Sequence, residues 1–291
     1  MQESIETAEG PAEQKPFDPE FAVRGRRKPV PARFDRLARL VGAPAIDRLA
    51  ESHVAIFGLG GVGSYAVEGL ARSGVGHLRM VDFDDVCITN FNRQLHALQG
   101  TVGTSKSLLM EQRVQSINPR CRIEAPQMFY DAETSESLLE APLDFVIDAV
   151  DNVTAKLHLL ATCVRREIPV ISCLGAAAKL DPSRIRVVPL TETHTDPLSQ
   201  AVRRNLRRKY QMTDEEMSRI TAVFSDEPPR DPDPNYTSEC GFECICPNGQ
   251  NGVHSCEARR LIYGSSVLVT SVFGMLAAAN IVQQIVRDSA E

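Results

Sequence analysis

A glycine-rich segment between a predicted strand and a predicted helix constrains the fold more than any other feature. The apolar run 53–57 is typical of a buried strand, and Gly58-Leu-Gly60-Gly61-Val-Gly63 follows it directly. Asp82 ends the next predicted strand, 19 residues after Gly63. Such glycines let the backbone approach phosphate or ribose, the helix start offers free N–H groups, and the acid binds ribose hydroxyls. The pattern predicts a site for an adenine nucleotide, which could be ATP, NAD or FAD. The alternative is a glycine turn that binds no ligand.

Apolar runs and helical periodicity alternate along the middle of the chain. The predicted strands are 53–57, 77–82, 120–124, 143–148, 169–173 and 184–190, and the predicted helices are 63–73, 106–117, 154–167 and 198–211. Strands that alternate with helices indicate parallel pairing covered on both sides. We therefore expect an α/β fold, a Rossmann-like, doubly wound, mainly parallel sheet with helices on both faces and a C-terminal substrate-side extension.

Composition divides the chain into three parts. Residues 1–31 are predicted to be a disordered tail, because the first twenty carry six acidic residues and one lysine. Residues 32–190 form the predicted nucleotide-binding domain, and 191–291 the C-terminal extension. The first residues have no apolar signal segment, which predicts a cytoplasmic protein with reduced thiols. The uncharged stretch 261–286 is long enough to span a bilayer, but its Ser, Thr, Asn and Gln residues favour a helix buried in protein over one in lipid. Peripheral membrane attachment stays an alternative.

Two cations and a carboxylate follow the glycine turn. Cleavage of a triphosphate requires cations to neutralise charge on the α-phosphate and the leaving pyrophosphate, and a carboxylate for Mg²⁺. Arg93 and Lys106 fit the cations, and Asp151 fits the Mg²⁺ carboxylate. A dehydrogenase needs no such cations, because its pyrophosphate rests on backbone amides. Each residue alone could be a solvated surface charge, but together they favour an ATP-cleaving enzyme.

Four motifs carry a family resemblance over about residues 33–181. LGGVGSYAVEGLARSGVG, VDFDDVCITNFNRQ, VGTSK and DAVDN resemble the adenylating domain of the ubiquitin-activating-enzyme superfamily, which includes the MoeB and ThiF proteins. The resemblance implies that Asp82 binds ribose, that Asp151 serves the metal and phosphates, and that Arg36 reaches into a partner subunit's site in a homodimer. The residues it implies for the phosphates and the rest of the nucleotide site are Asn90, Arg93, Lys106, Asp84 and Asn152.

The segments after this domain narrow the resemblance. The chain lacks the Cys-x-x-Cys pairs usual in MoeB-like and ThiF-like proteins. Instead, segments 175–185, 195–198 and 223–228 and the basic helix resemble the tRNA threonylcarbamoyladenosine dehydratases. That family uses ATP to cyclise N6-threonylcarbamoyladenosine in tRNA to its hydantoin form through an acyl-adenylate. The alternatives are an adenylyltransferase for a sulfur-carrier protein and a non-catalytic module that senses NAD or another nucleotide.

A basic helix supports a tRNA partner independently of the family. Arg203, Arg204, Arg207 and Arg208 share one face of the helix predicted at 198–211, which suits a phosphate backbone. The alternative is a solvated helix face paired with the acids at 214–216. Lys179 is a further candidate near the tRNA. Because 32 basic residues face 38 acidic ones, for a net charge of −6, we expect only a local patch and no DNA partner.

Half of the eight cysteines crowd into seventeen residues. Cys240, Cys244, Cys246 and Cys256 could hold zinc or an iron–sulfur cluster, form a redox or sulfur-accepting group, or simply lie in a loop. A redox or sulfur-accepting group would suit a cysteine-desulfurase or sulfur-acceptor partner. The remaining cysteines, Cys87, Cys121, Cys163 and Cys173, are predicted to be small buried hydrophobic residues, with Cys173 closest to the substrate.

Overall fold

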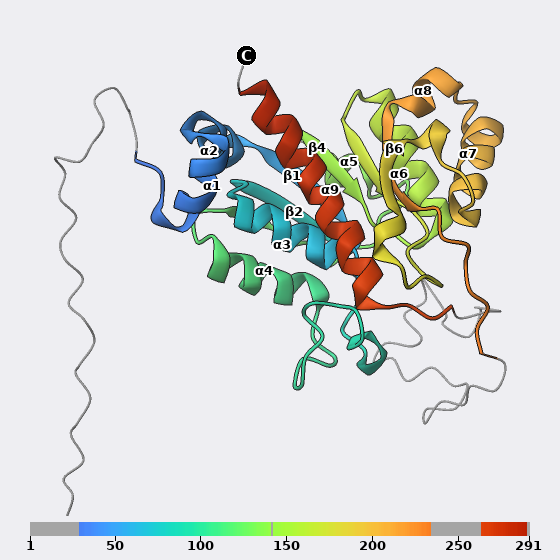
Figure 1. Ribbon diagram of the computed structural model, residues 1–291, viewed down its shortest axis with the longest axis horizontal. Coiled ribbons are helices and arrows are strands. Elements are labelled where there is room, and N and C mark those ends of the chain that lie inside the picture. The colour runs from blue at the N-terminus through green and yellow to red at the C-terminus, as the bar shows by residue number, and fades with distance from the viewer. Residues whose placement is uncertain (1–28, 141, 234–262, 290–291) are drawn as a thin grey trace, which may run out of the picture.

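Seven strands form the central sheet (Figure 1) of the computed structural model, which describes residues 29–140, 142–233 and 263–289. Their spatial order is β3-β2-β1-β4-β5-β7-β6. Neighbouring strands are parallel except β6 and β7, which pair antiparallel at one edge. The strands are β1 His53–Phe57, β2 His77–Val81, β3 Arg122–Glu124, β4 Phe145–Asp148, β5 Val170–Cys173, β6 Ile185–Pro189 and β7 Ile220–Ser225.

Helices cover both faces of the sheet, and each face has its own apolar core. Helices α2, α3, α4 and α9 enclose one core, and α5 to α8 enclose the other. The α-helices are α1 Asp35–Val41, α2 Ala43–Glu51, α3 Gly63–Ser73, α4 Lys106–Ile117, α5 Ser135–Leu138, α6 Val153–Arg165, α7 Pro197–Tyr210, α8 Asp214–Ser218 and α9 Val267–Asp288. The short 3₁₀ helices are η2 Ala32–Phe34, η3 Ile88–Asn90, η4 Pro182–Arg184 and η5 Leu190–Glu192. The predicted doubly wound α/β fold is confirmed.

The strand order reverses between β1 and β4, and this reversal positions the site. The chain passes from β1 to β2 and β3 on one side, then returns to β4 and β5 on the other. Loops after parallel strands diverge at such a point and leave a crevice at the carboxyl ends of the strands. The glycine turn, Asp82 and the turn that carries Asp151 follow β1, β2 and β4. The fold thus brings three of the predicted motifs to one edge.

The predicted strands agree with the observed ones to within two residues at each end, but β7 was missed. β7 pairs with β5 on one side and with β6 on the other, so it completes the sheet. The strand comes from the predicted extension, 191–291, whereas both of its neighbours come from 32–190. The sheet therefore continues across the predicted domain boundary.

Helix α9 is long and apolar enough to cross a membrane by length and composition alone, yet it forms part of the core. It packs along α3 (Figure 1), where a Cβ on Gly274 would overlap the carbonyl oxygen of Val62. A Cβ on Gly69 of α3 would lie 2.9 Å from the Cβ of Ala278. Small residues thus allow the two helices to approach closely. In the described part of the predicted segment, α9 therefore buries one face against the core, and 44% of its most apolar window is buried in the protein.

Candidate active site

Backbone contacts require two of the glycines after β1. Gly58 has a φ of +87°, and a Cβ there would lie 2.6 Å from Ala149 O. A Cβ on Gly63 would overlap the carbonyl oxygen of Gly58. Gly60 and Gly61 are less confined, with Gln94 Nε2 and Arg93 Cγ at 3.8 and 3.0 Å from their added Cβ atoms. Within the described chain no side chain caps the start of α3, which suits this helix N-terminus to an anion.

Asp82 holds the glycine turn in place. Its carboxylate accepts hydrogen bonds from the backbone N–H of Leu59 at 2.6 Å and of Asp84 at 2.8 Å. Burial raises the pKa of this carboxyl, although Lys106 opposes the effect. Each carboxylate oxygen keeps a further lone pair, which a ribose hydroxyl could use. Asp82 therefore has a structural role, which leaves room for the ribose role that remains a prediction.

Lys106 is the buried cation of the site. It is the first residue of α4, and its Nζ donates to Asp84 Oδ2 at 2.7 Å. Burial alone would lower its pKa, but the carboxylates of Asp82, Asp84 and Asp151 outweigh burial and raise it. Lys106 is consequently protonated at neutral pH. The structure brings these four predicted charges together at the carboxyl edge of the sheet.

Asn90 and Arg93 lie on the segment between β2 and α4. Asn90 is buried, and its Oδ1 accepts from the backbone N–H of Cys87 at 3.0 Å. Arg93 is half-buried beside Gly61, and its Nη1 donates at 2.9 Å to Thr89 O and to Asn92 Oδ1. Asn90 thus shapes the segment that presents the Arg93 guanidinium next to the glycine turn.

The turn after β4 carries Asp151 and Asn152. Asp151 is exposed, and its charge acts on Lys106. Asn152 is the N-cap of α6, where its side chain accepts from the N–H of Ala155 at 3.0 Å. Asn152 therefore has a capping role in the structure, and its nucleotide role remains a prediction.

A buried ion pair beneath this turn was missed in the sequence. Lys156 and Asp148 are both fully buried, and Lys156 Nζ lies 2.6 Å from Asp148 Oδ2. The same Nζ donates to Cys173 O at 2.9 Å, and Ser172 Oγ donates to Asp148 Oδ2 at 2.6 Å. Asp148 Oδ1 accepts from Val150 N at 3.2 Å, which ties the pair to the Asp151 turn. A lysine amid the apolar run of 153–164, eight residues after Asp148, was the available signal.

Lys179 lies in the interior rather than on a tRNA-facing surface. Its Nζ donates to Gly175 O at 2.7 Å, Asp196 Oδ1 at 3.0 Å and Ser225 O at 3.2 Å. The side chain is 1% exposed. These contacts join the loop after β5 to the start of α7 and the end of β7.

The four arginines of α7 have different surroundings. Arg203 is half-buried, and its Nη1 donates to the carbonyl and hydroxyl oxygens of Thr193. Arg207 pairs with Asp214 at 2.8 Å, as the alternative of an acid-paired helix face expected. Arg204 and Arg208 are exposed. The predicted helix is present, but Arg203 binds Thr193 within the protein instead of pointing into solvent.

The cysteines and Arg36 complete the comparison with the predicted sites. Cys87, Cys121, Cys163 and Cys173 are buried, as expected. Burial raises the pKa of Cys173 to about 12, which disfavours a thiolate near the substrate. Arg36 is exposed on α1. The predicted cluster at 240–256 lies outside the described residues, among which no group of His, Cys, Asp or Glu forms a metal site.

Comparisons with known proteins agree with this geometry. The model of the ThiF family matches residues 34–291. The chain is 40% identical to a tRNA threonylcarbamoyladenosine dehydratase of Bacillus subtilis over 88% of this chain and 95% of that protein. It is 34% identical to the Escherichia coli protein of that name over 89% and 95% of the two chains.

Solved structures give the same result. The crystal structure of the E. coli dehydratase TcdA in complex with ATP matches with a TM-score of 0.75 and 32% identity, covering 89% of this chain and 95% of that one. Its complex with AMP matches with a TM-score of 0.76 over 89% and 96%. Sequence and fold thus agree along nearly the whole described chain. The chain belongs to the ThiF family and, within it, to the tRNA threonylcarbamoyladenosine dehydratases.

Proposed function

We propose that this protein uses ATP to convert N6-threonylcarbamoyladenosine in tRNA into its cyclic hydantoin form through an acyl-adenylate. The observation that carries the proposal is the convergence of Lys106, Asp82, Asp84 and Asp151 at the glycine turn. It occurs in a chain 40% identical to a dehydratase over 88% of its length. ATP binding is supported by the similar TcdA structures that contain ATP and AMP.

The residues fit a reaction in two steps. In the first, a carboxylate oxygen of the threonyl group attacks the α-phosphorus of ATP, and pyrophosphate leaves with the electrons of the broken P–O bond. Negative charge then grows on the phosphates, where protonated Lys106 and the Arg93 guanidinium stabilise it. In the second step, a nitrogen of the same modification attacks the activated carbonyl carbon and loses its proton, and AMP leaves. Because this nucleophile is tethered to the carbonyl, proximity accelerates ring closure without a covalent cysteine.

Carboxylate oxygens at the site fit a divalent cation. Asp151 is exposed at the edge of the sheet, and the Asp84 side chain is 43% exposed. Mg²⁺ prefers such oxygen ligands together with substrate phosphates. Mg²⁺ bound there would neutralise phosphate charge during pyrophosphate release.

The rest of the proposal concerns partners and organisation. Arg36 completes the site of a second copy in a homodimer, and residues 191–291 contribute to the surface that binds tRNA. On α7 the exposed Arg204 and Arg208 are the arginines best placed for phosphates. The protein works in the cytoplasm, and the cysteines at 240–256 hold zinc or an iron–sulfur cluster or serve a sulfur-transfer partner.

Mass spectrometry of tRNA nucleosides from cells with and without this protein tests the proposal. The cyclic nucleoside should disappear, and its open form should accumulate, when the protein is absent. In vitro, threonylcarbamoyladenosine-containing tRNA should stimulate pyrophosphate release. Stimulation by a carrier protein ending in Gly-Gly instead would identify a sulfur-carrier adenylyltransferase, and tight NAD binding without ATP cleavage would exclude both enzymes.

A further inference from the structure

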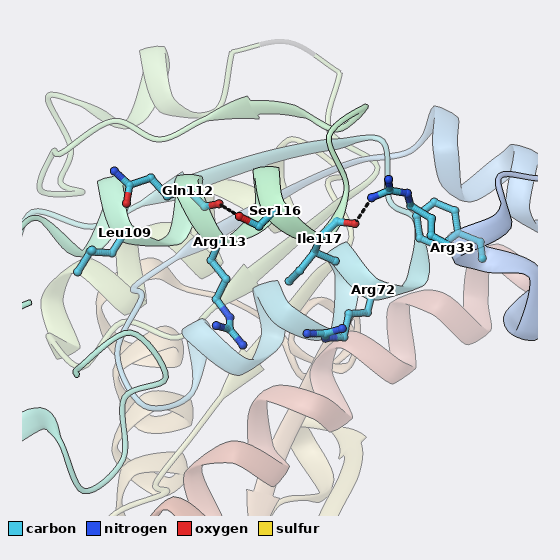
Figure 2. A pocket seen from close by; sticks show the side chains of 8 residues that line it. Arg33, Arg72, Leu109, Gln112, Arg113, Ser116 and Ile117 are labelled. Atoms are coloured by element: carbon cyan, nitrogen blue, oxygen red, sulfur yellow. Dashed lines mark hydrogen bonds between the residues drawn. The ribbon is translucent and has the colours of Figure 1, made fainter. Parts of the chain in front are cut away.

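An arginine-lined cleft of about 610 Å³ lies between η2, α3 and α4 (Figure 2). Arg33, Arg72 and Arg113 line it, one from each of these elements. Other lining residues, including Phe34, Gln112 and Ser116, carry no charge, and the described lining contains no Asp or Glu. The cleft therefore offers guanidinium groups from three directions to an anion.

Two of the arginines are fixed by one buried acid. Glu68 accepts from Arg113 Nε at 2.6 Å, from Arg113 Nη2 at 3.0 Å and from Arg72 Nε at 2.7 Å. Arg33 is fixed separately, because its Nη1 donates to Ile117 O at 2.5 Å (Figure 2). Each guanidinium has five N–H donors, so each retains donors beyond these bonds. The three guanidinium groups and the one carboxylate of Glu68 together carry a net charge of about +2. Because these hydrogen bonds already orient the arginines, less conformational entropy is lost when an anion binds.

The cleft lies close to the candidate active site. Helix α4 begins with Lys106 and carries Arg113 two turns later, about 10 Å along the helix. The charges of both Lys106 and Arg113 act on the buried imidazole of His96, because burial and then these two charges lower its pKa to about 4. This spacing of the two residues along α4 is similar to the length of about three stacked nucleotides, at about 3.4 Å per phosphate.

We propose that Arg33, Arg72 and Arg113 bind the phosphate backbone of the tRNA on one side of the modified adenosine. The inference rests on the proposed function, because it takes tRNA as the substrate. Arginine is suited to this role, since its planar fork binds phosphate oxygens in pairs. Arg72 and Arg113 remain accessible, with side chains 60% and 36% exposed.

The variant R33A/R72A tests the cleft and leaves Glu68 paired with Arg113. The matched control is R122A/R186A, which removes two exposed arginines, 74% and 53% exposed, outside the cleft lining. tRNA binding is measured at several salt concentrations, and the KM for tRNA, kcat and the KM for ATP are measured in the pyrophosphate-release assay. Thermal unfolding checks that both variants are folded.

We expect R33A/R72A to lower the log–log salt slope of tRNA binding by about 0.7–0.9 for each lost phosphate contact. Its KM for tRNA should rise about tenfold, while kcat at saturating tRNA and the KM for ATP stay at parent values. A salt slope equal to that of the control overturns the inference. So does a change confined to the binding of inorganic pyrophosphate, measured by calorimetry without tRNA, or a change confined to the association state in sedimentation. If the parent protein forms no cyclic nucleoside, the proposed function itself fails, which is a separate result.

Discussion

Removal of the Lys156 charge should destabilise the protein strongly. In Lys156→Met the Asp148 carboxylate loses its 2.6 Å partner and remains fully buried. The hydrogen bonds from Ser172 Oγ and Val150 N persist, but neither carries a compensating charge. Breaking a buried pair by removal of one partner costs about 3–5 kcal/mol. Because domains are stable by only about 5–15 kcal/mol, urea unfolding should show a large shift of the midpoint.

A second substitution separates the ion pair from simple packing. Asp148→Asn in the Lys156→Met background removes the buried charge with little change in volume, so part of the lost stability should return. The four proteins form a double-mutant cycle with an expected coupling of about 2 kcal/mol or more. A coupling below about 0.5 kcal/mol would show that the two residues do not act as a unit.

The single variant Lys156→Met should also weaken the binding of ATP with Mg²⁺, because Asp148 and Lys156 hold the turn that carries Asp151. Lys179→Met is the matched control, since Lys179 is likewise buried and its Nζ donates to one carboxylate and two carbonyl oxygens. Calorimetry under conditions where both variants are folded should show weaker ATP binding only for Lys156→Met. Equal ATP affinities in the two variants would refute the positioning role.

Three further expectations concern catalysis, pH and tRNA. Each of three single substitutions should reduce kcat about a hundredfold, equivalent to about 3 kcal/mol: Lys106→Ala, Arg93→Ala and Asp151→Ala. Reductions of tenfold or less in all three variants would contradict the assignment of these residues to catalysis. Burial lowers the pKa of His53 and of His96 to about 4, whereas an unfolded histidine titrates near 6.5. The unfolded chain therefore binds more protons, so the free energy of unfolding should be flat above about pH 6.5. It should fall toward pH 4, by at most about 1.4 kcal/mol per pH unit for each histidine, a slope that urea titrations measure. The double variant Arg204→Ala/Arg208→Ala should flatten the salt dependence of tRNA binding. Arg203→Ala should mainly lower the midpoint of thermal unfolding. The reverse pattern would reject the phosphate role of Arg204 and Arg208.

The sequence predicted the parts of the fold in which one local pattern decides the outcome. β1, β4 and β5 are buried on both faces, so their apolar runs were clear signals. Gly58 and Gly63 were recognisable because only glycine fits the contacts made there. The run that became β7 was equally apolar, but its position depends on pairing with β5 and β6, which are distant in sequence. Local patterns could not supply that pairing.

Side-chain roles were harder to predict than elements. Helical spacing placed Arg203 on the same face as Arg207, but the neighbouring η5 loop supplies Thr193 as its partner. Similarly, Lys179 stands in a loop rich in glycine and alanine, and its burial depends on Asp196 and β7. A charge in sequence does not reveal whether tertiary contacts will bury it. The family resemblance selected Lys106, Asp82, Asp84 and Asp151, which the structure brings to one edge of the sheet, because a motif carries such tertiary information.

Three buried lysines share a structural principle that no single motif displays. Lys106 binds Asp84 after β2, Lys156 binds Asp148 on β4 and Cys173 O on β5, and Lys179 binds Gly175 O after β5 and Ser225 O on β7. Four of the parallel strands therefore end on an ammonium group that a different element supplies. Burial of an ammonium group is costly unless oxygen acceptors surround it, so displacing any of these lysines from its acceptors would cost free energy. The same chemistry that makes Lys106 suitable for a triphosphate thus also fixes the loops around it.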